Sequence, residues 1–415
     1  MGVQGLSHFD RRDRLREALR NGREAVWLRD AVSDKSAIGT AIPASEIAAA
    51  AQRFARFQQV LAALFAREGW DGLIRSALIE FPVGIGGFVK CDHELPITGS
   101  IKARGGIHAV LAIIEQISDR NNLAHDRLTA EQGRALLVRH TIVVASTGNL
   151  GYSVGIFARA FGLQAEVHMS TDARGWKKDR LREIGARVVE HDCDYAETLV
   201  RARKAARAEG SWLVDDERSR DLLTGYAVAA DEVIQQLEAR GVLVDTAHPL
   251  VVYLPCGVGG APGGITHGLK SRFGCNVVTV FVEPVAAPCM LAALAFGGGT
   301  PVSVYDLGCD NRTIADGLAV PLASGLVLDA VGDAIDAAIA VPDAAMTRWM
   351  ARLWDAGRLR LEPSAAAAFA AGEHLLAVAP HQQGWPSLSG ATHLYWATGG
   401  SQMPEDEFVR VVAGQ

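Results

Sequence analysis

Short apolar runs alternate with helix-like segments along most of this chain. The apolar runs that predict strands lie at 142–145, 165–169, 187–190, 212–214, 250–254, 277–282 and 392–396. Segments with helical spacing lie at 40–67, 154–161, 177–184, 196–208, 222–237 and 264–273, and an alanine-rich stretch predicts further helices between 329 and 370. A helix between two strands returns the chain so that the strands run parallel, and a parallel sheet needs helices on both faces. The pattern therefore predicts an α/β protein with mostly parallel sheets.

The series of strands falls into two parts, which predicts two α/β layers. A first set of strands ends before Asp215, and a new series begins with the strongly apolar run at 250–254. A chain of 415 residues is also longer than one ordinary domain. We therefore expect a large domain made of residues 1–90 and 222–415, a smaller α/β domain made of residues 91–221, and a cleft that the two share.

Composition narrows the class of protein. Hydrophobic residues make up 49% of the chain and charged ones 21%, and there is no apolar run of about 18 residues, so a membrane span is not expected. The net charge of −6 argues against a nucleic-acid-binding surface. The six cysteines are scattered without C-x-x-C spacing, which predicts neither a zinc site nor a disulfide framework. The polar N-terminus fits no secretory signal, so we expect a cytoplasmic protein.

One lysine stands out by its position. Pro96 and a turn of small residues deliver Lys102 to the first turn of a predicted helix, whose apolar positions include Ile107 and Ile114. Burial and the N–H groups of a helix start both disfavour an ammonium group, so we expect the pKa of Lys102 to be lowered. A lysine with a free lone pair can form a Schiff base with a carbonyl. The alternative is a solvated surface lysine, since few lysines are buried.

A glycine-rich loop follows the strand predicted at 250–254. The loop runs from Cys256 to Gly264 and opens the next helix, so its backbone N–H groups can turn onto a phosphate. A Walker loop is excluded because no Gly-Lys-Ser/Thr follows. A dinucleotide fingerprint is damaged by Pro262, although Glu283 stands where a ribose-binding acid would. A tight strand-to-helix turn without a ligand is the remaining alternative.

A second loop, from Ser146 to Asn149, also closes a strand and starts a helix. It presents the hydroxyls of Ser146 and Thr147, the amide of Asn149 and backbone N–H groups to an anion such as a carboxylate. An ordinary helix cap is the alternative. Asp215 and Asp216 end the strand at 212–214 and could either face a substrate hydroxyl or cap the next helix.

Three of these features together resemble one enzyme family. They are the block 100–106 around Lys102, the loop 146–151 and the glycine loop 256–264. In this combination the chain resembles the fold-type-II pyridoxal-phosphate enzymes of the serine/threonine dehydratase family, from about residue 85 to about residue 405. The resemblance implies two three-layer α/β/α domains like those of the tryptophan synthase β subunit. Pyridoxal 5′-phosphate would bind to the large domain, and the small domain would carry Lys102 and the carboxylate loop.

The resemblance also implies a role for each matching residue. Lys102 would be the catalytic residue and hold the cofactor as a Schiff base. Cofactor contacts are implied for Asn149 at the 3′-oxygen, for Gly257, Val258, Gly259 and Gly260 at the phosphate, for Gly317 at the ring edge and for Thr398 at the ring nitrogen. Substrate contacts are implied for Ser146, Thr147 and Gly148, at the carboxylate, and Asp216 is predicted from its place at a strand end to contact the substrate as well. The segment with Lys177 and Lys178 is assigned to domain packing instead.

The implied reaction is the β-elimination of D-serine to pyruvate and ammonia. Ile101, Thr147 and Leu150 resemble the branch that acts on D-serine, and side activity on D-threonine is left open. The hydroxyl of Thr398 does not favour a protonated ring nitrogen, which suits a carbanion that needs little stabilisation. An L-serine or L-threonine dehydratase of the same fold stays open, as do an NAD-dependent oxidoreductase and a non-enzymatic amino-acid sensor. We expect a small-molecule substrate as the partner, and a monomer or homodimer.

The same family implies a monovalent-cation site. Glu283 ends the strand after the glycine loop, and a buried carboxylate without a partner would either be protonated or lie beside a cation. Related dehydratases place potassium or sodium at the matching acid, with oxygen ligands that fall here near Ala287 and Cys289. The alternative is a carboxylate bonded to backbone N–H groups.

Overall fold

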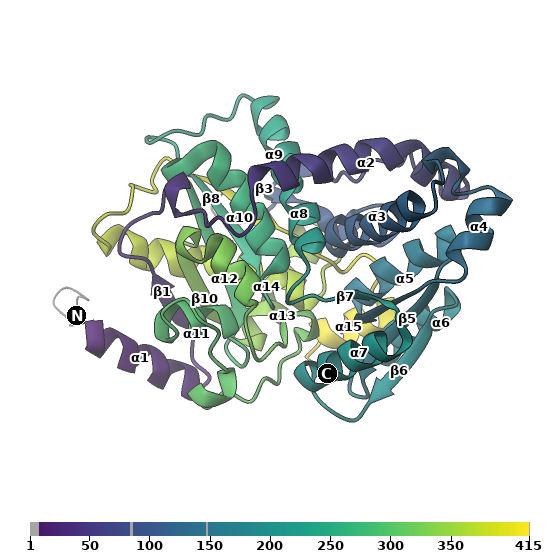
Figure 1. The fold of residues 1–415 in the computed structure, drawn as a ribbon. Coiled ribbons are helices and arrows are strands. Elements are labelled where there is room, and N and C mark those ends of the chain that lie inside the picture. Colours follow the sequence, from purple (N-terminus) through teal and green to yellow (C-terminus); the bar gives the residue numbers. More distant parts are fainter. Residues whose placement is uncertain (1–7, 84–85, 147, 415) are drawn as a thin grey trace.

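The strands of the protein form two separate sheets (Figure 1). The structure is a computed structural model and describes residues 8–83, 86–146 and 148–414. The larger sheet has the order β1 (Ala25–Leu28), β10 (Ala337–Val341), β9 (Val277–Pro284), β8 (Leu250–Pro255), β11 (Thr392–Trp396), β3 (Phe88–Lys90) and β2 (Leu78–Glu80). The smaller sheet has the order β6 (Arg187–His191), β5 (Gln164–Ser170), β4 (Thr141–Ala145) and β7 (Trp212–Val214).

Most neighbouring strands run parallel, as the alternation of strands and helices predicts. In the smaller sheet every strand pair is parallel. In the larger sheet β10, β9, β8, β11 and β3 run parallel to one another, and only the edge strands β1 and β2 pair antiparallel. The edge strands come from the N-terminal part of the chain, so this segment completes the sheet that the C-terminal half supplies.

The larger sheet lies between two groups of helices. Along β8, Val251 and Tyr253 join the hydrophobic cluster that includes residues of α13 (Asp343–Gly357) and α14 (Pro363–Val378). Leu250 and Val252 join the other cluster, with residues of α10 (Gly260–Phe273), α11 (Cys289–Phe296) and α12 (Gly325–Val331). Because successive side chains of a strand point to opposite faces, both faces of this strand are buried. The result is a three-layer α/β/α arrangement.

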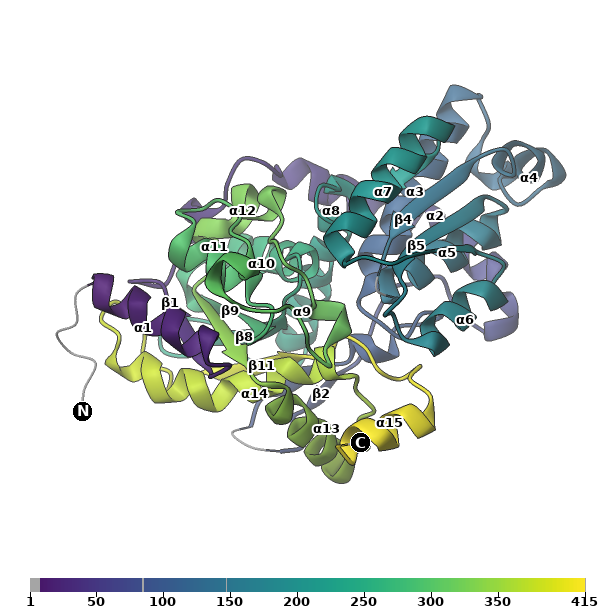
Figure 2. The same ribbon diagram turned by 90° about the horizontal axis from the view of Figure 1, so that it is seen from below.

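The smaller sheet is covered in the same way. Figure 2 shows β4 and β5 between α7 (Tyr195–Glu209) on one side and α5 (Asn149–Phe161) and α6 (Gly175–Glu183) on the other. The short helix α4 (Glu131–Leu137) precedes β4. The predicted fold class, two three-layer α/β/α units with mostly parallel sheets, is therefore confirmed.

Helices α3 (Lys102–Arg120) and α8 (Arg220–Ala227) connect the two sheets. Helix α3 packs against α5 and α8, and α8 packs in turn against α10 of the larger unit. The contact of α3 with α8 is very close, because a Cβ atom at Gly105 would lie 2.5 Å from Cζ of Tyr226. The amphipathic helix α2 (Ala44–Leu64) covers both α3 and α8. The remaining helices are α1 (His8–Arg20), α9 (Ala229–Glu238) and α15 (Glu405–Val412).

Two details of the predicted elements are wrong. The helix predicted at 222–237 is two helices, α8 and α9, separated at Val228. The stretch predicted to hold only helices between 329 and 370 contains strand β10, whose alanines are fully buried between β1 and β9. Pairing on both edges outweighs the helix propensity of alanine there. Of the helices in the described ranges, none is long and apolar enough to cross a membrane.

Candidate active site

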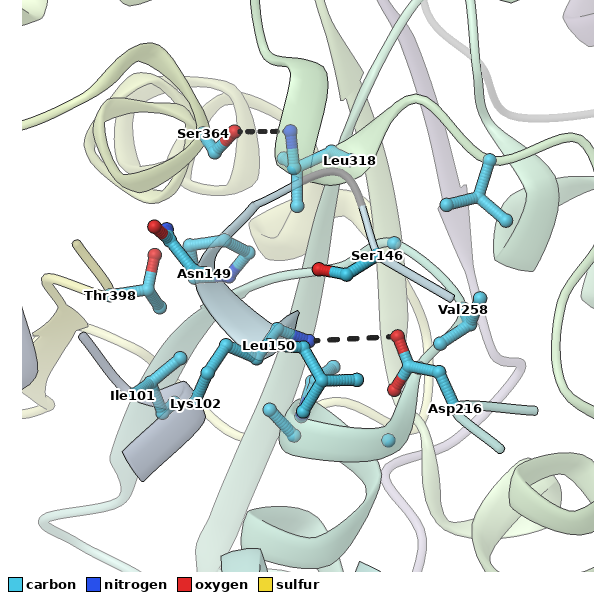
Figure 3. Close-up of a pocket in the computed structure, with 18 of the residues that line it drawn as sticks. Ile101, Lys102, Ser146, Asn149, Leu150, Asp216, Val258, Leu318, Ser364 and Thr398 are labelled. Atoms are coloured by element: carbon cyan, nitrogen blue, oxygen red, sulfur yellow. Dashed lines mark hydrogen bonds and ion pairs between the residues drawn. The ribbon is translucent and has the colours of Figure 1, made fainter. Parts of the chain in front are cut away.

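A pocket lies where the carboxyl ends of the parallel strands in the two sheets meet. Loops that follow β4, β7, β8 and β11, together with the start of α3, supply its lining (Figure 3). This is the position at which open α/β sheets bind ligands. The predicted site residues that line it are Lys102, Ser146, Asn149, Asp216, Gly257, Val258, Gly259, Gly260, Gly317 and Thr398.

Lys102 begins α3 and is held by the loop before it. The backbone N–H of Ile101 donates to the carbonyl of Thr398 at 2.8 Å, and Ser100 forms an isolated antiparallel bridge with Gly399. These contacts fix the turn that delivers the lysine. Nζ of Lys102 lies 3.9 Å from Oδ2 of Asp216, the ion pair drawn in Figure 3.

The expected lowering of the pKa of Lys102 is wrong. Burial does lower it, but the carboxylate of Asp216 and the phenol of Tyr226 outweigh burial, so the pKa lies above its ordinary value. The ring of Tyr226 is centred 5.7 Å from Nζ. A carboxylate so close stabilises the ammonium form, which the sequence position of the lysine does not reveal. The amine must therefore lose a proton before it can attack a carbonyl.

The glycine loop forms the cup that its sequence predicts. Among the described residues, none accepts a hydrogen bond from the backbone N–H of Gly257, Val258 or Gly259. Gly259 has φ +105°, a conformation that favours glycine, and it stands immediately before the first residue of α10. A Cβ atom at Gly257 would lie 3.1 Å from the carbonyl oxygen of Gly317. The free N–H groups at a helix start fit a phosphate.

Part of the loop after β4 caps the start of helix α5. Oγ of Ser146 accepts hydrogen bonds from the N–H groups of Gly148 at 2.9 Å and Gly151 at 2.8 Å, so the helix-cap alternative applies to this hydroxyl. Gly148 is not among the lining residues of the pocket. Thr147 lies outside the described residues. A role of this loop in binding a substrate carboxylate stays a prediction.

Asn149 begins a charged network that the sequence analysis missed. Its Nδ2 donates to Oε1 of Glu362 at 2.7 Å, and Nζ of Lys177 lies 3.6 Å from Oε2 of the same carboxylate. Lys177 also donates to both carboxylate oxygens of Asp316 at 2.9 Å. Burial raises the pKa of Glu362, partly offset by Lys177. Lys177 and Glu362 line the pocket, so the assignment of Lys177 to domain packing is incomplete.

Two further hydroxyls sit on the larger unit. Thr398 lines the pocket and follows β11 after Ala397. Oγ of Ser364, at the start of α14, accepts from the N–H of Gly317 at 3.2 Å and so fixes the loop at the pocket wall (Figure 3). Ser364 was not predicted, because nothing in an alanine-rich helix marks its first turn as a site.

The neighbouring residues Asp215 and Asp216 have different contacts in the structure. Asp215 binds Arg203 through both oxygens, at 2.8 and 2.9 Å, and is not among the lining residues of the pocket. Asp216 lines the pocket. The alternative that these residues cap the next helix is wrong, because Ser219 caps α8 through the N–H of Leu222.

Glu283 has protein partners. Its two oxygens accept hydrogen bonds from the N–H groups of Met290 at 2.7 Å and Leu291 at 2.8 Å, at the start of α11. Burial raises the pKa of this carboxyl to about 7. Cys289, beside it, donates to the carbonyl of Gly257 at 3.3 Å and so links this site to the cup. Within the described ranges there is no group of three or more His, Cys, Asp or Glu side chains placed to hold a metal ion.

Comparison with known proteins identifies the class. Residues 64–386 match the family model described as "Pyridoxal-phosphate dependent enzyme". The chain therefore belongs to the pyridoxal-phosphate-dependent enzymes.

Two named relatives match the chain over most of its length. The chain is 46% identical over 402 residues to a protein of Cupriavidus pinatubonensis named "Probable D-serine dehydratase", covering 91% of this chain and 90% of that one. It is 44% identical over 415 residues to a protein of the same name from Chromobacterium violaceum, covering 93% and 92%.

Solved structures share the fold. Holo diaminopropionate ammonia lyase from Escherichia coli superposes with a TM-score of 0.75 at 20% identity, covering 95% of this chain and 98% of that one. The processed form of threonine deaminase isoform 2 from Solanum lycopersicum gives a TM-score of 0.59 at 20% identity, covering 92% and 85%. At these identities the likeness concerns the fold.

Proposed function

We propose that this chain is a pyridoxal-phosphate-dependent ammonia-lyase that converts D-serine to pyruvate and ammonia. The observation that carries the proposal is the pocket itself, because it brings Lys102, the glycine cup and Thr398 together between the two sheets of the described chain. The names of relatives at 46% and 44% identity support D-serine as the substrate.

The residues present fit the cofactor. Gly257, Val258 and Gly259 would bind its phosphate through backbone N–H groups that donate to no other described residue, and Thr398 would meet its ring nitrogen. Asn149 has a second amide proton beyond the one it gives to Glu362, which can reach the 3′-oxygen. Lys102 would hold its carbonyl carbon through Nζ. When bound, pyridoxal phosphate withdraws electrons from the substrate's Cα and so makes its proton acidic.

The chain's own residues then handle the protons. With its proton removed, Nζ of Lys102 would be a base that lines the pocket and could take the Cα proton of the substrate. Asp216, 3.9 Å away, stabilises the ammonium that this transfer creates. Glu362, held beside the Lys177–Asp316 ion pair, accepts a hydrogen bond from Asn149 and so orients its amide in the pocket.

A spectrum and a product assay test the proposal. The purified protein should show a visible absorption band that borohydride removes, and it should form pyruvate and ammonia from D-serine in equal amounts. Turnover of L-serine or L-threonine in place of D-serine would support the other dehydratase. A protein without the band but with nicotinamide-dependent activity would be an oxidoreductase, and one that binds amino acids without turnover would be a sensor.

We also propose a potassium or sodium ion beside Glu283, with oxygen ligands near Ala287 and Cys289. A fully buried carboxylate with a pKa near neutrality gains from a neighbouring cation. Its two bonds to the start of α11 leave each oxygen a further lone pair for an ion. D-threonine side activity, a monomer or homodimer, a cytoplasmic location and the domain boundaries at residues 91 and 222 stay predictions.

A further inference from the structure

Tyr195 is the first residue of α7, and its side chain reaches the pocket. The residue is 8% exposed and lines the same pocket as Lys102 and Asp216. Its hydroxyl group is buried and has no hydrogen-bond partner among the described residues. Buried hydroxyls almost always find a partner, because leaving one unpaired costs its lost hydration. A hydroxyl without a protein partner at a pocket wall therefore points to a ligand.

A matching acceptor is present in the same pocket. Oδ1 of Asp216 is also buried without a hydrogen-bond partner in the described part of the chain, while Oδ2 faces Lys102. Burial first, and then the negative charge of Asp216, hold the pKa of Tyr195 well above its ordinary value. The phenol is consequently neutral and can donate its proton to a hydrogen bond at any physiological pH. An ionised carboxylate has no proton to donate, so in that form Asp216 can only accept a hydrogen bond.

A donor and an acceptor suit one hydroxyl group. An aliphatic hydroxyl has one proton to give and lone pairs to receive with, so it satisfies both partners at once. The substrate of the proposed reaction carries such a group on Cβ. We propose that Oη of Tyr195 donates a hydrogen bond to the Cβ hydroxyl of the bound substrate, whose own proton is accepted by Oδ1 of Asp216.

This inference rests on the proposed function and deepens it, because it names the residue that recognises the leaving group. In the elimination, the Cα–H electron pair forms the new C=C bond and the Cβ–O pair leaves with oxygen. The proton lost at Cα and the hydroxyl lost at Cβ together make one water, so no oxidant or co-reactant is needed. A hydrogen bond from Tyr195 offsets the negative charge that grows on the departing oxygen before the proton arrives.

A change of leaving group tests this role. Chloride departs without a proton, so β-chloro-D-alanine does not need the hydrogen bond from Tyr195. In Tyr195→Phe we expect kcat/KM for D-serine to fall roughly 10- to 100-fold, and that for β-chloro-D-alanine to change less than about 3-fold. Tyr152→Phe, a change on α5 outside the pocket lining, is the matched control and should leave both rates unchanged. Equal losses on the two substrates would overturn the proposal.

Equilibrium binding gives a readout that does not depend on turnover. α-Methyl-D-serine carries the hydroxyl but has no Cα proton to lose, and 2-aminoisobutyrate lacks the hydroxyl. The wild-type protein should bind α-methyl-D-serine at least about 5-fold more tightly, and Tyr195→Phe should reduce this preference. If the wild-type protein binds the two ligands equally well, the proposal is wrong. This comparison does not depend on whether Tyr195→Phe folds. If the wild-type protein forms no pyruvate from D-serine, the proposed function and this inference are both wrong. If it turns D-serine over normally but binds the two ligands equally well, this inference alone is wrong.

Discussion

Asn149 donates a hydrogen bond to Glu362 across 2.7 Å, although the two residues belong to different α/β units. Asn149 starts the helix that follows β4, and Glu362 stands before the helix that packs on β8 and β9. Lys177 strengthens the same connection, because it contacts both Glu362 and Asp316. The pocket is therefore complete only when the two α/β units are together, and this network of Asn149, Lys177, Asp316 and Glu362 is one of the contacts that join them.

Replacing Lys102 by Ala is expected to lower the turnover of D-serine by at least about 1000-fold while leaving the fold intact, because an amine at a pocket wall is lost rather than core volume. Pyruvate release measures the first effect, and circular dichroism measures the second. Lys204→Ala, at an exposed position of α7, is the control. Pyruvate release near the wild-type rate would contradict the assignment of Lys102.

Replacing Thr398 by Asp is expected to favour a protonated ring nitrogen, because a carboxylate stabilises a pyridinium and a hydroxyl does not. The visible absorption of the cofactor should shift and elimination should slow. Thr398→Ser keeps the hydroxyl and should behave like the wild type. If the spectrum and the rate of the Asp variant were both unchanged, Thr398 would not face the ring nitrogen.

Replacing Lys177 by Met is expected to destabilise the protein, because the change leaves Asp316 and the buried Glu362 without their cation. We expect the free energy of unfolding to fall by about 2–4 kcal/mol. Most of this loss comes from the buried Glu362, because the partly exposed Asp316 is still solvated by water. Denaturant unfolding of the cofactor-free protein measures it. Lys204→Met changes an exposed lysine and should have an effect near zero; an equally small effect for Lys177→Met would show that the network carries no stability.

The stability of the protein is expected to fall below about pH 6.5, partly through His108. Burial lowers the pKa of this histidine to about 4 in the folded protein, from 6.5. The unfolded chain therefore binds the proton first as pH drops, and a contribution of about 3 kcal/mol, fully present above pH 6.5, is lost by about pH 4.

In His108→Gln the free energy of unfolding should depend less steeply on pH, because one titrating group is lost. Part of the dependence should remain, because burial also lowers the pKa of His393 to about 4. Urea unfolding between about pH 4 and about pH 7.5 measures the slopes. Parallel slopes for His108→Gln and wild type would contradict the argument.

Exchange of potassium and sodium for a bulky organic cation at constant ionic strength tests the ion proposed beside Glu283. We expect weaker binding of pyridoxal phosphate, because Cys289, at the end of the loop, contacts the carbonyl of Gly257 in the cup. Titration of the cofactor-free protein measures the affinity. Equal affinity and equal turnover in both salts would rule the ion out, and Glu283 would then rely on the backbone N–H groups that it already binds.

The sequence by itself determined the repeating α/β architecture and the residues with the strongest local signals. The apolar runs in β8 and β9 and the glycines at Gly257 and Gly259 need no distant partner to be recognised, because periodicity and backbone freedom are local properties. Lys102 was singled out by its place at a helix start together with the resemblance of the block 100–106, the loop 146–151 and the glycine loop to one enzyme family. Most of the cofactor-binding and substrate-binding residues that the resemblance implied line one pocket.

Only the tertiary structure decided which charges meet. Asp216 reverses the expected pKa shift of Lys102, and Glu362 and Tyr195 lie at the pocket although nothing around them in the sequence marks them. Strand β10 likewise exists because β1 and β9 pair with it on both sides. Coulomb interactions, burial and strand pairing depend on distances between residues far apart in the chain, and those distances are set by the packing of α3 and α8 between the two sheets.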